Sequence, residues 1–141
     1  MRIMGIDYGD ARTGVAISDL LCTIAGSAMV VPSRNREKAI GDIVRLAKEN
    51  QVGEIVVGLP RNMDGSEGSR AQLCREFGES LKEATGLPVA MWDERRTTVE
   101  AHNILSQHNY HGKKRKDTVD AVAATLILEG YLDFKKRNGS I

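Results

Sequence analysis

The chain has 141 residues and a formal net charge of +1, with 41% hydrophobic and 28% charged residues. This length suits one domain with one core. Because acids and bases nearly cancel, binding of polyanions through the overall charge is excluded, and nucleic-acid binding would need a local basic patch. The sequence contains no apolar run near the roughly 18 residues of a membrane span and no signal-peptide pattern. We therefore expect a cytoplasmic protein that does not bind membranes.

The cysteines and histidines do not form a motif for zinc or for a disulfide. Cys22 and Cys74 stand alone, outside any CxxC pattern. His102, His108 and His111 lack the spacing of metal ligands, both among themselves and with the cysteines. We therefore expect two free thiols and no zinc site.

The first third of the chain predicts three β-strands. Apolar runs occupy residues 2–7, 14–19 and 24–31. A short polar segment with a glycine on each side, GDARTG, connects the first two runs, which is typical of a hairpin. We expect the third run to extend this hairpin into an antiparallel meander.

The middle of the chain predicts helices and strands in alternation. Apolar residues at helical spacing predict helices over 36–49 and 70–85, with Leu73 in the apolar stripe of the second helix. Compact apolar runs at 54–60 and 87–93 are typical of strands that are buried on both faces. Such alternation indicates parallel strands connected by right-handed crossovers.

Two helices are predicted in the last third of the chain. Thr97 and Glu100 have the spacing of a capping box, which predicts a helix over 98–108. A basic segment follows, and Asp117 is placed to cap a last helix that runs to about residue 132.

The complete pattern predicts an α/β fold with a five-stranded mixed sheet, in which a three-stranded antiparallel meander is joined by two parallel strands and flanked by helices. We expect one domain over residues 1–135. Residues 136–141 are predicted to form a frayed C-terminal tail.

Acidic residues follow the strands at one predicted edge of the sheet. Asp7 ends the first strand, and Asp93 and Glu94 end the last. Asp120 falls in the first turn of the predicted final helix, where the helix dipole favours a carboxylate. Taken singly, Asp7 could cap a turn and Asp120 could be an ordinary first-turn acid. Functional sites of open α/β sheets lie at the carboxyl ends of the strands, so we expect these acids to converge.

A cluster of carboxylates at this edge predicts a metal site. Unpaired carboxylates in close contact repel one another, and a divalent cation removes that repulsion. Oxygen ligands without histidine or cysteine suit Mg²⁺ or Mn²⁺. Ions held in this way can activate water and stabilise the leaving oxygen of a phosphodiester. The acids therefore indicate metal-assisted phosphodiester hydrolysis.

Four segments carry a resemblance to a known family. They read GIDYGDARTGVAISD, LPRNMDGSEG, WDERRTTVEA and TVDAVAATLILEGYL, and they occur in this order along nearly the whole chain. Together they resemble the YqgF or RuvX-like family, whose members are described as pre-16S rRNA nucleases or as Holliday junction resolvases. The resemblance implies a ribonuclease H-like fold in which the first and fourth strands are neighbours.

One departure from the wider fold affects the site. Many ribonuclease H-like nucleases have an acid at the end of the fourth strand, but this chain has Gly58 and Leu59 there. The DER segment at 93–95 is the expected source of the missing carboxylate. Alternation sends Asp93 and Glu94 to opposite faces of the strand. We favour Glu94 as the metal ligand, with Asp7 and Asp120, and keep Asp93 as the alternative.

Other polar residues are candidates for substrate binding. Arg95 offers a planar fork of donors to phosphate oxygens. A run of four cations at 113–116 is often only a solvated loop, but its place beside the proposed site favours contacts with backbone phosphates. Asn62 belongs to a segment that either forms a plain turn or positions the substrate. The cationic candidates are Arg95, Lys113, Lys114, Arg115 and Lys116.

These expectations combine into a metal-dependent endonuclease, using Mg²⁺ or Mn²⁺, that acts as a monomer or weak homodimer. The resemblance implies processing of the 5′ end of precursor 16S rRNA during ribosome biogenesis. Cleavage of branched DNA, as by a Holliday junction resolvase, and a non-catalytic RNA- or ribosome-binding role are the alternatives. The first segment also resembles a phosphate loop of sugar kinases and actin-like ATPases, which use two such domains around ATP.

Overall fold

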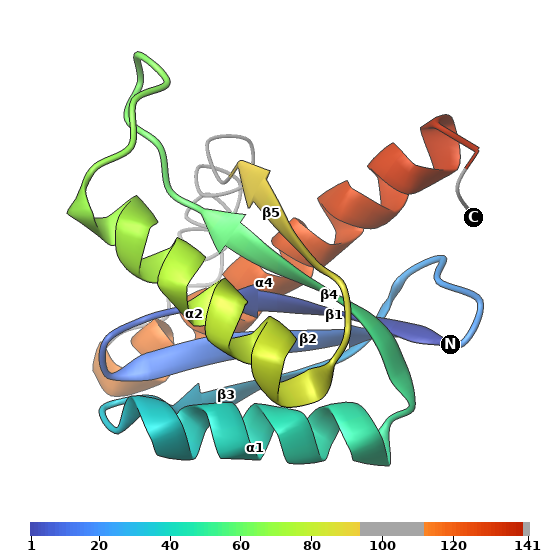
Figure 1. The fold of residues 1–141 in the computed structure, drawn as a ribbon, viewed down its shortest axis with the longest axis horizontal. Coiled ribbons are helices and arrows are strands. Elements are labelled where there is room, and N and C mark those ends of the chain that lie inside the picture. The colour runs from blue at the N-terminus through green and yellow to red at the C-terminus, as the bar shows by residue number, and fades with distance from the viewer. Residues whose placement is uncertain (94–111, 140–141) are drawn as a thin grey trace.

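The computed structural model describes the backbone of residues 1–93 and 112–139, and the side chains of residues 1–93 and 121–139 (Figure 1). The predicted helix over 98–108 lies outside the described residues. In chain order the elements are β1 (Arg2–Asp7), β2 (Arg12–Ser18), β3 (Ala25–Pro32), α1 (Arg36–Glu49), β4 (Val52–Leu59), α2 (Ser69–Thr85), β5 (Val89–Asp93) and α4 (Gly112–Arg137).

The five strands form one mixed sheet in the order β3-β2-β1-β4-β5. β1, β2 and β3 are an antiparallel meander, whereas β4 runs parallel to both β1 and β5. This arrangement confirms the predicted fold class and the pairing of the first strand with the fourth. It also directs the carboxyl ends of β1, β4 and β5 to the same edge of the sheet.

Helices cover both faces of the sheet. In Figure 1, α1 and α2 lie in front of the sheet and α4 crosses behind it. Alternation along β1 separates two cores: Met4 and Ile6 belong to the core on the side of α1 and α2, and Ile3 packs with residues of α4. A residue of β1 with an odd number therefore faces α4.

Gly5 allows α4 to approach the centre of the sheet closely. A Cβ atom at this position would lie 2.8 Å from the Cβ of Leu128 and 3.0 Å from the carbonyl oxygen of Ala124. Both distances are too short for an undisturbed contact, so a side chain at position 5 would push the helix away. The backbone of α4 consequently passes directly over β1.

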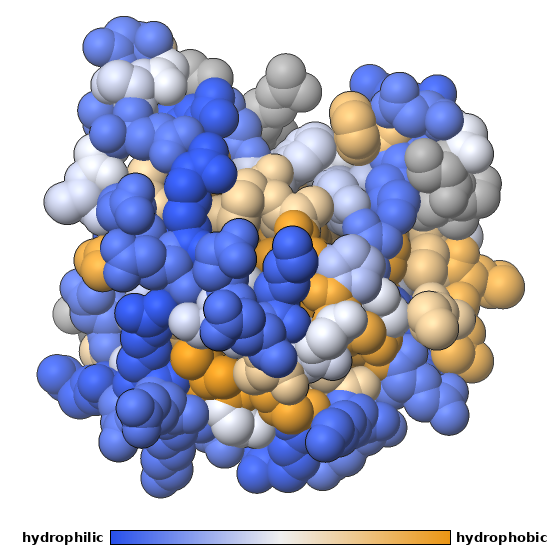
Figure 2. Space-filling model, viewed as in Figure 1, coloured by the Kyte–Doolittle hydropathy of each residue, from blue (hydrophilic) through white to orange (hydrophobic). Residues whose placement is uncertain are grey.

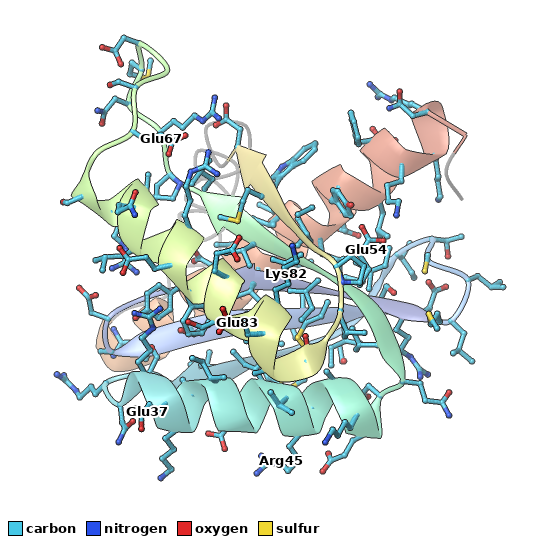
Figure 3. The ribbon with its side chains drawn as sticks, in the orientation of Figure 1. Glu37, Arg45, Glu54, Glu67, Lys82 and Glu83 are labelled. Carbon is cyan, nitrogen blue, oxygen red and sulfur yellow. The ribbon has the colours of Figure 1, made fainter. Side chains whose placement is uncertain are left out.

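The C-terminal half of α4 is anchored at the opposite edge of the sheet by a polar cluster around Glu54, which Figure 3 labels. The Tyr131 hydroxyl and the Lys135 ammonium both donate to the Glu54 carboxylate. The distance from Lys135 Nζ to Glu54 Oε1 is 2.5 Å. Burial, together with the neighbouring carboxylate, raises the pKa of the Tyr131 hydroxyl. The hydroxyl therefore stays protonated and remains a donor.

The start of α4 corrects one prediction. The helix begins at Gly112, so Asp117 does not cap it and the basic residues at 113–116 form its first turns in place of a loop. Lysine and arginine are good helix formers, and no glycine or proline interrupts the segment after Gly112. At its other end α4 reaches Arg137, so Lys136 and Arg137 are helical although we assigned them to the frayed tail.

Two further predictions about burial were wrong. β5 is an edge strand with intermediate burial at each of its residues, whereas we expected a strand buried on both faces. In α2 the buried face contains Ala71 and Cys74, and Leu73 is 39% exposed. Phe77 and Leu81 are buried on the same face of α2, so the error concerns the place of Leu73 in the apolar stripe.

The surface is mainly polar with a few exposed apolar side chains. Figure 2 shows hydrophilic residues over most of the visible face, with small apolar areas between them. Among the described residues, Met63, Met1 and Leu21 are the most exposed large apolar residues, at 94%, 81% and 75%. None of the helices in the described part of the chain combines the length and the hydropathy that crossing a membrane requires.

Candidate active site

Asp7 is the last residue of β1 and is half-buried. It is paired with Gly14 of β2, and it follows Ile3 and Gly5 in the alternation that faces α4. The Asp7 side chain is therefore directed to the face of the sheet that α4 covers. This places a carboxylate at the carboxyl edge, where the sequence predicted it.

The turn after Asp7 is held by side chains from three parts of the chain. The Gly9 N–H donates to the buried Thr13 hydroxyl at 3.3 Å, and the Ser33 hydroxyl donates to the Gly9 carbonyl at 2.5 Å. A Cβ at Gly9 would lie 2.2 Å from the Arg12 carbonyl oxygen, so only glycine fits this turn. The Tyr8 ring stacks on Phe77 of α2 with centroids 4.0 Å apart.

Asp93 ends β5 on the other face of the sheet. It lies opposite Leu59 of β4 and follows Val89 and Met91, which pack against the core of α1 and α2. Trp92 points to the α4 side, where its ring packs edge-on against Phe134, with ring centroids 5.8 Å apart. Asp7 and Asp93 therefore belong to opposite faces of the sheet.

Asp120 lies inside α4, more than two turns after Gly112, and not in the first turn as predicted. The dipole of the helix N-terminus therefore does not account for an acid at this position. Its backbone is one helical turn before Ala124, whose carbonyl lies next to Gly5. Leu128 and Ala124 lie over Gly5, and following α4 one turn back toward its N-terminus, from Ala124 to Asp120, leads toward the end of β1 that carries Asp7.

The loop after β4 forms a compact turn with Asn62 at its base. The Asn62 N–H donates to the Ser66 carbonyl at 2.9 Å, its side-chain amide donates to the Ser66 hydroxyl at 2.9 Å, and Gly65 has a positive φ of 88°. These bonds fit the plain turn that we kept as one interpretation. Asn62 stands beyond β4, at the carboxyl edge shared with Asp7.

Arg75 of α2 connects this loop to the helix, and Arg61 adds a contact within the loop. Arg75 donates through two nitrogens to the Glu67 carboxylate, both at 2.7 Å, and Arg61 lies 3.4 Å from the same group. The bonds from Arg75 lower the pKa of Glu67, and Arg61 adds to the effect. Figure 3 shows Glu67 below the projecting loop. The loop is thus tied to the helix at its base and free to project at its tip.

Part of the predicted site lies outside the described residues. Glu94 and Arg95 are not described, and the side chains of Asp120 and of residues 113–116 are not described either. Within residues 1–93 and 121–139, no group of three or more His, Cys, Asp or Glu side chains is arranged to hold a metal ion. Of the predicted metal ligands, the structure therefore describes only the side chain of Asp7.

Sequence reasoning missed the side chains that support the Asp7 turn. Thr13 and Ser33 are buried polar residues beside strand segments, at 0% and 2% exposure. Thr13 lies in the polar GDARTG segment, where a threonine is ordinary, so the local sequence does not signal its burial. Ser33 gives no signal either, because its partner is 24 residues away in the sequence.

Solved structures of similar fold place the chain in a class. A fowlpox virus Holliday junction resolvase matches with a TM-score of 0.60 at 12% identity, covering 95% of this chain and 99% of that one. A Thermus thermophilus RuvC, solved in complex with a Holliday junction substrate, matches with a TM-score of 0.56 at 16% identity, covering 99% and 97%. The fold is that of the ribonuclease H-like resolvases.

Sequence relatives identify the family within this class. The family model described as "RuvX: Holliday junction resolvase" matches residues 1–134. Relatives from Halothermothrix orenii and Thermoanaerobacter pseudethanolicus, each bearing the name "Putative pre-16S rRNA nuclease", are both 46% identical over 137 residues. The alignments cover 97% and 96% of this chain, and 98% and 99% of the relatives. The chain belongs to the RuvX family, and it is by class a nuclease that hydrolyses phosphodiester bonds.

Proposed function

We propose that this protein is a metal-dependent endonuclease that processes the 5′ end of precursor 16S rRNA in the cytoplasm. The main support is the position of Asp7, a carboxylate at the carboxyl edge of the sheet on the face that α4 covers. The names of the two relatives at 46% identity support precursor rRNA as the substrate.

We propose Asp7, Glu94 and Asp120 as the residues that would hold Mg²⁺ or Mn²⁺. The donor set fits these ions, because it consists of carboxylate oxygens without histidine or cysteine. Asp93 is disfavoured as a ligand, since it lies on the face opposite to Asp7. The alternation that assigns Asp93 to that face favours the next residue in the sequence, Glu94, for the face of Asp7.

The residues of the chain would have distinct tasks in this reaction. A bound divalent ion would supply the Lewis acid that activates water and stabilises the leaving oxygen. The carboxylates at positions 7, 94 and 120 would set the charge and the geometry of its site. Arg95 and the cations at 113–116 would bind phosphates, and Asn62 would place the loop after β4 against the substrate.

Variants at positions 93 and 94 test which of these two acids is the metal ligand. We expect Glu94→Gln to lower kcat by about 10²-fold, the order of loss that follows when a preorganised charge is removed from a reaction centre. Asp93→Asn should retain activity within about fivefold, since this acid lies away from Asp7. The measurement is single-turnover cleavage at saturating Mn²⁺. The reverse ranking of the two variants would assign the ligand role to Asp93.

The substrate is tested by direct comparison. We expect the purified protein with Mg²⁺ or Mn²⁺ to cut a precursor 16S rRNA fragment near the mature 5′ end faster than a four-way DNA junction of equal concentration. The product ends should be mapped, and the reaction repeated with EDTA, which should stop it. Faster cutting of the junction, with paired symmetric incisions, would favour the resolvase assignment in place of ours.

The resolvase remains the second candidate because the family model itself carries that description. Junction cleavage with paired cuts requires two active sites related by a two-fold axis, and hence a dimer. Sedimentation of the protein with and without a junction therefore distinguishes the two candidates. A protein that binds precursor rRNA tightly but cuts neither substrate would instead be a ribosome-binding factor.

A further inference from the structure

Arg70 contacts the turn that follows Asp7, although it lies in a different part of the chain. It is the second residue of α2. One guanidinium nitrogen, Nη2, donates to the Tyr8 carbonyl at 2.5 Å, and the other, Nη1, lies 2.7 Å from an oxygen of the Asp10 carboxylate. The guanidinium carbon also lies 5.0 Å from the centre of the Tyr8 ring. Arg70 thus holds Tyr8, the residue directly after Asp7, through both its carbonyl and its ring, and it also binds Asp10 two residues further on.

We propose that Arg70 is a positioning residue for Asp7, an inference that rests on the proposed nuclease function. The peptide carbonyl that it binds belongs to the residue next to Asp7, so its bond restricts the backbone on the C-terminal side of that carboxylate. On the N-terminal side, residues 3–6 are buried in the sheet. A carboxylate that is fixed from both sides needs less reorganisation to bind an ion in one geometry.

The location of Arg70 is unfavourable for the stability of α2 itself. The first turn of this helix contains no acid, and the helix has no side-chain cap at Gly68. A cation in the first turn opposes the helix dipole and is therefore unfavourable for the helix. An arginine is therefore better explained at this position by what it binds across the turn than by a contribution to the helix.

The rest of α2 supports the same turn. Phe77, two helical turns after Arg70 and fully buried, stacks on the Tyr8 ring with an interplanar angle of 12°. The Tyr8 ring and the Tyr8 carbonyl are thus both held by α2, the ring by Phe77 and the carbonyl by Arg70. Any shift of α2 relative to β1 would be transmitted to the residue next to Asp7.

A direct role in phosphate binding is the main competing explanation. The Arg70 side chain is 35% exposed at the edge of the sheet where the substrate would bind. Two of its nitrogens already bind protein oxygens, and the Asp10 carboxylate offsets its charge. Both facts reduce its capacity to attract phosphate. The positioning role and the phosphate role predict opposite effects on kcat and KM.

The test compares Arg70→Gln and Arg70→Lys with Arg45→Gln, an equal change of charge on the exposed surface of α1. For cleavage of the precursor rRNA fragment, Arg70→Gln should lower kcat by about 10- to 100-fold, leave KM within about twofold, and raise the Mn²⁺ concentration needed for half-maximal rate. Arg70→Lys should not rescue it, because an ammonium lacks the planar fork that binds carbonyl and carboxylate together. A raised KM with normal kcat, rescued by lysine, would overturn the positioning role.

Hydrogen–deuterium exchange gives a readout that does not require activity. Amides of residues 8–11 should exchange several-fold faster in Arg70→Gln than in Arg45→Gln at equal thermal stability. Unchanged exchange would overturn the inference even if the enzyme is active. If the wild-type protein cuts neither substrate but the exchange rises as expected, the proposed function fails while the support of the turn by Arg70 stands.

Discussion

Replacing Asp7 by asparagine should reduce cleavage by at least about 10²- to 10³-fold, the loss expected when a preorganised charge is removed from a reaction centre. The substitution keeps the size of the side chain and one oxygen, but it removes the negative charge that a divalent ion requires. Substrate affinity should persist, since the cations that contact phosphates are unchanged. The measurement is single-turnover cleavage of precursor rRNA at saturating protein, with binding followed separately by gel shift.

Asp133→Asn provides the matched control. It makes the same chemical change on α4, at a residue whose carboxylate is exposed and paired with Arg137 at 3.0 Å. Its activity should equal that of the wild type. Mn²⁺ should raise the melting temperature of both the wild type and this control, because a ligand bound only to the folded state stabilises it. Asp7→Asn should lose that increase.

Full activity of Asp7→Asn would be decisive against a metal site at the end of β1. Normal rRNA processing in cells that carry only this variant would favour the non-catalytic binding role. A loss of cleavage supports the metal site only if Asp7→Asn still unfolds cooperatively, so that its Mn²⁺-dependent shift in melting temperature can be compared with that of Asp133→Asn. That shift should be present in Asp133→Asn.

The fold could be predicted from the sequence where local pattern and burial agree. β1 and β4 are central strands with continuous apolar runs, and the GDARTG segment indicates the hairpin that joins β1 to β2. β5 shows the limit of this approach. Its apolar run resembles that of a central strand, but the sheet order places it at an edge, and only the pairing of distant strands determines that position.

The start of α4 was mispredicted because the capping preference of Asp117 was given more weight than the helix propensity of the cations before it. Asp117 is a good capping residue, so we took it as the boundary and treated the cations before it as a loop. Those cations are also strong helix formers, and the helix continues through them to Gly112. For the proposed site, this means that the position of Asp120 follows from the packing of α4 across the sheet, and not from a helix start.

Of the candidate site, the sequence indicates only the acids, and among the three proposed metal ligands the structure describes the side chain of Asp7 alone. Acids at strand ends are visible in a sequence, because parallel strands direct their carboxyl ends to one edge. The supporting contacts are not visible. Arg70 and Tyr8 are separated by 62 positions, and their contact depends on how α2 packs against β1. Nothing in the local sequence around Arg70 distinguishes it from a surface arginine.

Gly5→Val should both destabilise the protein and impair catalysis, because Gly5 sets the distance between β1 and α4. The added Cβ would meet Leu128 at 2.8 Å and Ala124 at 3.0 Å. Overpacking of this kind costs about 1–3 kcal/mol, and the branched side chain should bring the loss to the upper end of that range. Differential scanning calorimetry should record a melting temperature lower by roughly 5–10 °C.

Catalysis should respond to Gly5→Val because α4 also carries Asp120. A displacement of the helix by about 1 Å would move this acid relative to Asp7, and misplacement of that size can cost about 10²-fold in rate. Gly5→Ala should give a smaller loss of both thermal stability and cleavage rate. Gly41→Ala is the control, since a Cβ at Gly41 has no neighbour within 4 Å and alanine favours the helix interior by roughly 0.5–1 kcal/mol. If Gly5→Val kept both the stability and the rate of the wild type, the close approach of α4 would not be what brings Asp120 to the site.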